Sequence, residues 1–148
     1  MNKEFLNVIV ADSNENTLIF FKNIFKELKI CIKIQCFNNA DNLMKYLNNA
    51  DAVIPEIVFI EYHISGKNCL ECIEEIKSNL KFMNMVTAVY SEQIPDNEIE
   101  DIFVKGANIC MKKPEDYEKL KKVLTDVITI NWQYHTSGLN KENFIMKA

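Results

Sequence analysis

Apolar residues follow two alternating patterns along this chain. Short runs rich in β-branched residues, such as Val8-Ile9-Val10 and the segment 57–60, have the continuous apolar character of strands that are buried on both faces of a sheet. Between them lie longer stretches whose apolar residues recur every three or four positions, which is typical of the buried side of a helix. The patterns predict strands at 5–11, 31–37, 57–60, 85–90 and 107–111, and helices at 18–28, 40–49, 67–80, 95–105 and 115–130.

Five strand–helix pairs in regular alternation predict an α/β fold. Helical connections between parallel strands are right-handed, and they place helices on both faces of a single parallel sheet. Five strands are too few for an eight-stranded barrel, so the predicted architecture is an open, doubly wound (βα)5 sheet. Ligands of such sheets bind outside the carboxyl ends of the strands. The loops that follow the strands are therefore the place to look for a site.

The composition is that of one globular domain. The chain has 148 residues, of which 48% are hydrophobic and 26% charged, and its 3 Gly and 3 Pro are too few for a low-complexity linker or a turn-rich β-sandwich. The net charge is −4 and all 17 basic residues are Lys, which argues against a nucleic-acid-binding protein. We predict one domain over residues 1–131 and a tail over 132–148 with no room for a separate output domain.

The tail contains two apolar clusters. Trp132 and Tyr134 are placed to cap the core beneath the last helix, while Phe144, Ile145 and Met146 are able to dock on this chain or on a neighbour. Disorder of the tail is an equally good interpretation, because chain ends are ordered only where they are tied down.

The five cysteines are an odd number in a chain that is long enough to fold without disulfides, which indicates reduced thiols and a cytoplasmic protein. The first apolar stretch is about seven residues long and is not followed by a small-residue cleavage site, so it is not a signal peptide. No later stretch approaches the ~20 apolar residues of a membrane span. We therefore expect no association with a membrane.

Cys69 and Cys72 form a CxxC pair near the start of a predicted helix, the context in which redox-active dithiols occur. A thiol redox protein is therefore an alternative from a different functional class. The helical spacing places Cys72 beside Ile73 and Ile76, which favours a packing role for the pair.

Polar residues follow four of the five predicted strands. Asp12 stands after the first strand, Glu61 after the third, Ser91 at the end of the fourth, and Lys113 after the fifth. Each one alone is explained by the polar residues that flank any buried strand, but all four should meet at one edge of the sheet. Carboxylates hold Mg²⁺, while a hydroxyl and an ammonium group bind anionic oxygens, so the set suits a phosphoryl group with a carboxylate as its acceptor.

The chain contains, in this order, the segments VIVADSNEN, PEIVFIEYHISGKNCLECIEEIK, VYSEQ and FVKGANICMKKP. Their sequence and spacing resemble the receiver domain of two-component response regulators over about residues 5–131. The resemblance implies a CheY-like, flavodoxin-like fold with strand order 2-1-3-4-5. In that family two acids follow the first strand, and an Asp after the third strand accepts a phosphoryl group from the histidine of a sensor kinase. The face around helix 4, strand 5 and helix 5 then shifts.

The resemblance implies a role for each residue at the predicted edge. Glu61 stands at the phospho-acceptor position, and Asp12 and Ser13 stand at the two acidic positions. Ser91 and Lys113 stand at the positions that contact the phosphoryl oxygens.

Among the positions that depart from the family pattern, three bear on the phosphorylation switch. Ser13 replaces the second acid, Glu61 replaces the acceptor Asp, and Cys110 stands where a switch aromatic, Tyr or Phe, is usual. The extra methylene of Glu61 displaces the nucleophile, and reactive geometry is sensitive to errors of ~1 Å. It also extends the carboxylate toward Lys113, with which we predict a standing ion pair.

The same departures weaken the predicted metal site. Asp12, Glu61 and the backbone carbonyl of His63 are the ligands that remain, and a Ser hydroxyl is a poor substitute for a carboxylate. We therefore predict that Mg²⁺ binds weakly and that no cofactor is required.

We expect a stand-alone, degenerate receiver-like protein, or pseudo-receiver, of a two-component phosphorelay. It would act by docking to a protein partner, either a sensor histidine kinase or a downstream signalling protein, with Glu61 mimicking the phosphorylated state. No enzymatic activity is expected, and a homodimer is compatible with the sequence. The alternative within this class is a conventional receiver that is switched by Mg²⁺-dependent phosphorylation.

Overall fold

The computed structural model describes residues 5–137 and 145–148, and the side chains of 5–134 and 145–148. Within these residues, six parallel strands form one sheet in the order β2-β1-β3-β4-β5-β6. The strands are β1 (Phe5–Ala11), β2 (Cys31–Phe37), β3 (Ile57–Glu61), β4 (Val86–Ser91), β5 (Ile109–Lys112) and β6 (Met146–Lys147). The helices are α1 (Glu15–Glu27), α2 (Ala40–Leu47), α3 (Cys69–Lys77), α4 (Asp96–Val104) and α5 (Tyr117–Ser137), with a 3-10 turn at Leu80–Phe82. The predicted doubly wound fold and its strand order 2-1-3-4-5 are confirmed.

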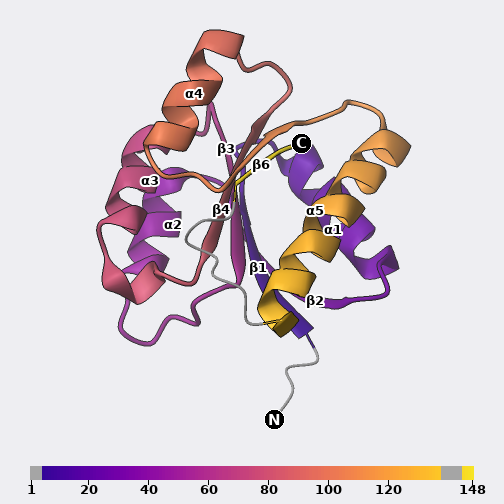
Figure 1. The fold of residues 1–148 in the computed structure, drawn as a ribbon, viewed down its shortest axis with the longest axis horizontal. Coiled ribbons are helices and arrows are strands. Elements are labelled where there is room, and N and C mark those ends of the chain that lie inside the picture. Colours follow the sequence, from indigo (N-terminus) through magenta and orange to yellow (C-terminus); the bar gives the residue numbers. More distant parts are fainter. Residues whose placement is uncertain (1–4, 138–144) are drawn as a thin grey trace.

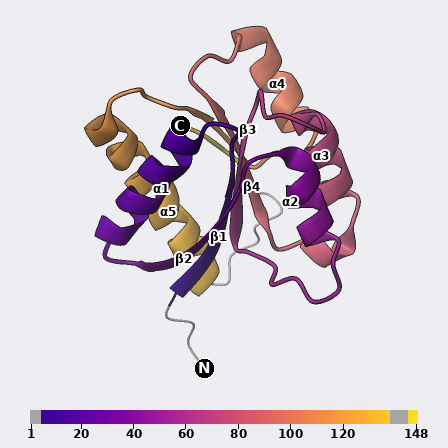
Figure 2. The ribbon, with the colours of Figure 1, turned by 180° about the vertical axis from the view of Figure 1, so that it is seen from behind.

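Helices cover both faces of the sheet (Figures 1 and 2). Helices α1 and α5 lie on one face, and α2, α3 and α4 lie on the other. Successive residues of β1 alternate between the two layers: Val8 and Val10 pack with the α1 and α5 side chains, while Ile9 packs with those of α2, α3 and α4. The central strands are apolar on both sides because both sides are buried.

Asparagine side chains begin three of the helices at the carboxyl end of the sheet. Asn14 accepts hydrogen bonds from the backbone of Asn16 and Thr17, and so caps α1. Asn39 and Asn68 cap α2 and α3 in the same way. These bonds satisfy backbone donors that the first turn of a helix leaves free, and they fix the loops that carry the residues at the strand ends.

The C-terminal segment is more structured than the sequence indicates. Helix α5 continues to Ser137, past its predicted end at residue 130, and Met146 and Lys147 add a sixth strand beside β5. Trp132 and Tyr134 are partly buried against the α1/α5 core, in line with the predicted cap. The predicted docking residue Phe144 lies outside the described residues.

The lengths and hydropathies of the helices show whether any of them could cross a membrane. Across the described parts of the chain, none of the helices combines the length and the apolar character that crossing a bilayer requires.

Candidate functional site

The carboxyl ends of β1, β3, β4 and β5 converge on one pocket of about 220 Å³. The structure brings together here the four residues that the sequence singled out at the strand ends, Asp12, Glu61, Ser91 and Lys113. The other lining residues are Asn14, Thr17, His63 and Glu92. Asp12, Ser91 and Lys113 are all buried, so their polar groups are held in fixed positions by the fold.

Both carboxylate oxygens of Asp12 are occupied by protein donors. Oδ1 accepts the backbone N–H of Asn14 at 2.8 Å, and Oδ2 accepts the hydroxyl of Tyr90 at 2.6 Å. Tyr90 is fully buried in β4, and its ring packs against Phe21 and Phe59. Burial and the neighbouring Asp12 raise the pKa of Tyr90 well above its ordinary value, so the hydroxyl stays protonated and keeps donating.

Sequence reasoning missed Tyr90. A signal was available, because a buried tyrosine hydroxyl usually needs a hydrogen-bond partner and Tyr90 stands just before the strand end. What the sequence could not supply was the pairing that brings this ring across the sheet to the acid after β1.

Ser13 faces away from the pocket toward a neighbouring loop. Its hydroxyl donates to Ser65 Oγ at 2.8 Å and accepts the Ser65 N–H at 2.9 Å. Ser13 is absent from the residues that line the pocket. Ser13 therefore links the loop before α1 to the loop after β3 by hydrogen bonds.

The predicted ion pair between Glu61 and Lys113 is wrong. The Lys113 ammonium lies 3.2 Å from Oε1 of Glu92, and the backbone N–H of Lys113 donates to the Ser91 carbonyl. Because β4 and β5 are neighbours, Lys113 comes beside the residues that end β4. Glu61 is instead bonded by its own loop, since Oε2 accepts the His63 N–H at 2.9 Å. Glu92 stands directly after Ser91 in VYSEQ, and sequence reasoning assigned it no role.

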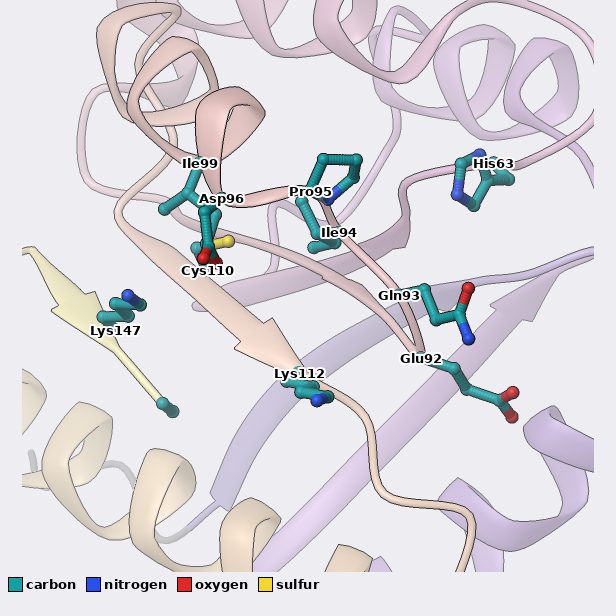
Figure 3. Close-up of a pocket in the computed structure, with 11 residues that line it drawn as sticks. His63, Glu92, Gln93, Ile94, Pro95, Asp96, Ile99, Cys110, Lys112 and Lys147 are labelled. Atoms are coloured by element: carbon teal, nitrogen blue, oxygen red, sulfur yellow. The ribbon is translucent and has the colours of Figure 1, made fainter.

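A larger cavity, of about 740 Å³, adjoins this pocket (Figure 3). Cys110 lines it, and its small side chain stands where the family resemblance implies an aromatic ring. His63 and Glu92 line both cavities, so the two spaces share a wall. The space beside Cys110 extends from the start of α4 to β5 and β6.

Tyr62 links the loop after Glu61 to α4. Its hydroxyl faces the Glu98 carboxylate, and its ring meets His63 edge-on with centroids 5.0 Å apart. Loss of solvent around the phenol, followed by the influence of Glu98, raises the pKa of Tyr62 to about 12. This contact connects the acceptor loop to α4 without a ring at position 110.

The residues of the pocket fit a divalent cation poorly. Mg²⁺ binds through carboxylate oxygens, and here both oxygens of Asp12 and one of Glu61 each already share a lone pair with a protein donor, which competes with coordination. Among the residues that the structure describes, no group of three or more His, Cys, Asp or Glu is arranged to hold a metal ion.

The CxxC pair lies inside the protein. Cys69 and Cys72 are buried in the core beneath α3, and the Cys72 thiol donates a weak hydrogen bond to the Lys67 carbonyl. Burial raises the pKa of Cys72 to about 11 and raises that of Cys69 further. Redox dithiols need a lowered pKa on at least one sulfur, so this environment disfavours the redox alternative.

Alkylation checks this conclusion. At about pH 8, where a thiolate of ordinary pKa is well populated, iodoacetamide is expected to label the exposed Cys31 first, while Cys69 and Cys72 react only after unfolding. Peptide mass spectrometry reads out each site, and alkylation in denaturant provides the control for full labelling. Rapid labelling of Cys69 or Cys72 in the native protein would revive the redox interpretation.

Comparison with solved structures agrees with the fold. No protein-family model matches the sequence, and no curated protein matches it significantly. Among solved structures, the phosphorylated cyanobacterial phytochrome response regulator RcpA is similar at a TM-score of 0.78 and 15% identity, over 90% of this chain and 96% of that chain. The Mn²⁺-bound response regulator Rcp1 follows at 0.76 and 12%, over 84% and 92%. The red-light response regulator RPA3017 of R. palustris is similar at 0.75 and 14%, over 88% and 93%. The fold is that of response-regulator receiver domains.

Proposed function

We propose that this chain is a receiver-like module of two-component signal transduction that does not use phosphorylation as its switch and acts by docking to a protein partner. The receiver fold and the four residues at one edge of its sheet support the receiver-like part. The single observation that supports the loss of the phosphorylation switch is the hydrogen bonding of Asp12, whose two carboxylate oxygens accept from Asn14 and Tyr90.

The positive charge of Lys113 is already paired within the chain. In a conventional receiver, the Lys at position 113 would meet an oxygen of the phosphoryl group. Here Glu92 supplies an anion to Lys113 at 3.2 Å, so Glu92 takes the part that we had predicted for Glu61. Glu61 is the third carboxylate in the same pocket, beside Asp12 and Glu92.

The acceptor position is also unsuited to attack. Glu61 carries its carboxylate one methylene further than Asp, and its Oε2 is turned onto the His63 N–H. A nucleophile that is misplaced by ~1 Å loses most of its reactivity. One similar structure is of a phosphorylated protein and another of a Mn²⁺-bound one, so the proposed loss belongs to the side chains of this chain and not to the fold.

The proposed partner is a protein, either a sensor histidine kinase or a downstream signalling protein. The negative net charge and the absence of Arg make nucleic acid a poor partner. The conventional, phosphorylation-switched receiver is the competing function, because Ser91 and Lys113 are both retained at the pocket.

An NMR titration separates the two functions. Amide chemical shifts are followed as Mg²⁺ is raised through the millimolar range, with and without beryllofluoride as a phosphoryl analogue. We expect no saturable change at the amides of Ser13, Asn14, Tyr62 and His63. Saturable changes at these amides, enlarged by beryllofluoride, would establish the conventional switch.

A further inference from the structure

The outer edge of β5 is covered by the last residues of the chain. The N–H of Met146 donates to the Asn108 carbonyl at 2.7 Å, and the N–H of Ala148 donates to the Cys110 carbonyl at 2.9 Å. In return, the N–H of Lys112 donates to the Ala148 carbonyl at 3.1 Å. An exposed parallel edge is a template for any extended chain, and here the protein pairs that edge with a segment of itself.

The attachment of this segment is small. Strand β6 spans two residues, whereas β1 and β2 pair over seven positions. Met146 is the one side chain of β6 that packs against the core, and it is only partly buried. Ile145 before it is 66% exposed. Segments with few buried apolar contacts and solvent-exposed backbone hydrogen bonds open at low free-energy cost.

Strand β6 also forms a wall of the larger cavity (Figure 3). Lys147 and Ala148 close one side of the 740 Å³ space, and Cys110 and Lys112 of β5 lie beside them. Ile94, Pro95 and Ile99 contribute apolar surface from the start of α4. Release of β6 would therefore expose two things together, the backbone edge of β5 and a partly apolar groove that runs to the pocket at Asp12, Glu61 and Lys113.

We propose that the β5 edge is a strand-binding surface and that β6 occupies it as a displaceable internal ligand. The partner it fits is an extended protein segment that pairs with β5 in parallel and places an apolar side chain where Met146 now packs. The segment Ile145–Ala148 supports this choice of partner, because it is an extended segment that already pairs with β5. The inference deepens the proposed docking function and rests on it for its biological use.

Proline substitutions in the full-length chain test the exchange. Met146→Pro and Ala148→Pro each remove one N–H that donates to β5, while Lys147→Pro is the matched control, because the N–H of Lys147 is not among the bonds to β5. The probe is a fluorescent peptide KENFIMKA, residues 141–148, and the readout is anisotropy. A tethered strand competes at millimolar effective concentration, so we expect at least about tenfold tighter peptide binding to the two variants than to wild type or Lys147→Pro.

Amide exchange provides a second readout that needs no variant. In the wild-type chain, Met146 N–H bonds to β5 and Asn108 N–H bonds to the Thr87 carbonyl of β4. We expect Met146 and Ala148 to exchange about a hundredfold faster than Asn108, because β6 opens without the sheet. Equal peptide binding by all four proteins, no binding by any of them, or exchange at Met146 as slow as at Asn108 would overturn the proposal. None of these results depends on phosphorylation. Strand exchange at β5 can therefore be disproved while the chain still fails to be phosphorylated, and it can be established even if the chain proves to be phosphorylated.

Discussion

Replacing Tyr90 with Ala is expected to lower the free energy of unfolding by about 4 kcal/mol, the usual loss for truncating a buried aromatic residue. Tyr90 is 0% exposed and contacts the rings of Phe21 and Phe59. Tyr90→Phe keeps those contacts and removes only the hydroxyl that donates to Asp12, so the expected loss is about 1.5–3 kcal/mol, the range for a hydrogen bond to a charged group.

Urea denaturation of each variant measures these losses. Tyr62→Phe is the matched control, since it also removes a phenol hydroxyl that faces a carboxylate, Glu98, but at a half-buried position. Its expected effect is below about 0.5 kcal/mol. If Tyr90→Phe were no more destabilising than Tyr62→Phe, the bond to Asp12 would not hold the pocket in its closed state.

The Tyr90 bond also has a signature in alkaline solution. The pKa of Tyr90 is raised in the folded protein above its ordinary value of 10.0, so unfolding above that pH releases a proton. The stability that the raised pKa contributes is complete below pH 10.0 and is lost as the pH rises toward the folded pKa. The stability of the Tyr90→Phe variant is therefore expected to fall less steeply above pH 10.0 than that of the wild type.

The second large effect is expected from restoring two carboxylates. Ser13→Asp together with Glu61→Asp replaces the hydroxyl at the second acidic position and shortens the acceptor by one methylene. We expect the double variant to bind Mn²⁺ about a hundredfold more tightly than wild type, because hard divalent ions are selected by the number and reach of their carboxylate ligands. Adding Tyr90→Phe frees Oδ2 of Asp12 and is expected to strengthen binding again.

Isothermal titration calorimetry with Mn²⁺ measures the gain. The control is Ser13→Asn with Glu61→Gln, which places polar side chains at both positions without negative charge and is expected to gain no affinity. Wild-type affinity equal to that of the double variant would show that the departures at Ser13 and Glu61 do not impair the metal site.

The fold could be predicted because its signal is spread over many positions. The continuous apolar run at 57–60 and the largely apolar segment 85–90 indicate strands buried on both faces, and they form the centre of the sheet. Strand β6 could not be predicted this way. Two residues carry no periodic pattern, and their conformation is set by the free edge of β5, which exists only once the sheet has formed.

The site could be predicted in part for a similar reason. Each residue that directly follows a strand, such as Asp12 or Lys113, is placed by the strand itself, so its position at the rim follows from the chain order. Partner choice among the rim residues depends on distances of a few ångströms that the sequence does not contain. Lys113 therefore pairs with Glu92 and not with Glu61, and Asp12 is reached by Tyr90 from two strands away.

Some residues of the pocket match the receiver-domain pattern and others depart from it. The fold is that of a receiver domain, and we attribute a weakened site for Mg²⁺ and a phosphoryl group to Ser13, Glu61 and the bond between Tyr90 and Asp12. Signalling would then depend on which surfaces the chain presents to a protein partner.

Intact mass spectrometry after incubation with Mg²⁺ and acetyl phosphate tests directly whether the chain can be phosphorylated. The double variant Ser13→Asp with Glu61→Asp, treated in parallel, is the positive control for transfer at this position. We expect the wild-type chain to keep its unmodified mass throughout. A wild-type adduct with the mass of one phosphoryl group, mapped to Glu61, would contradict this expectation.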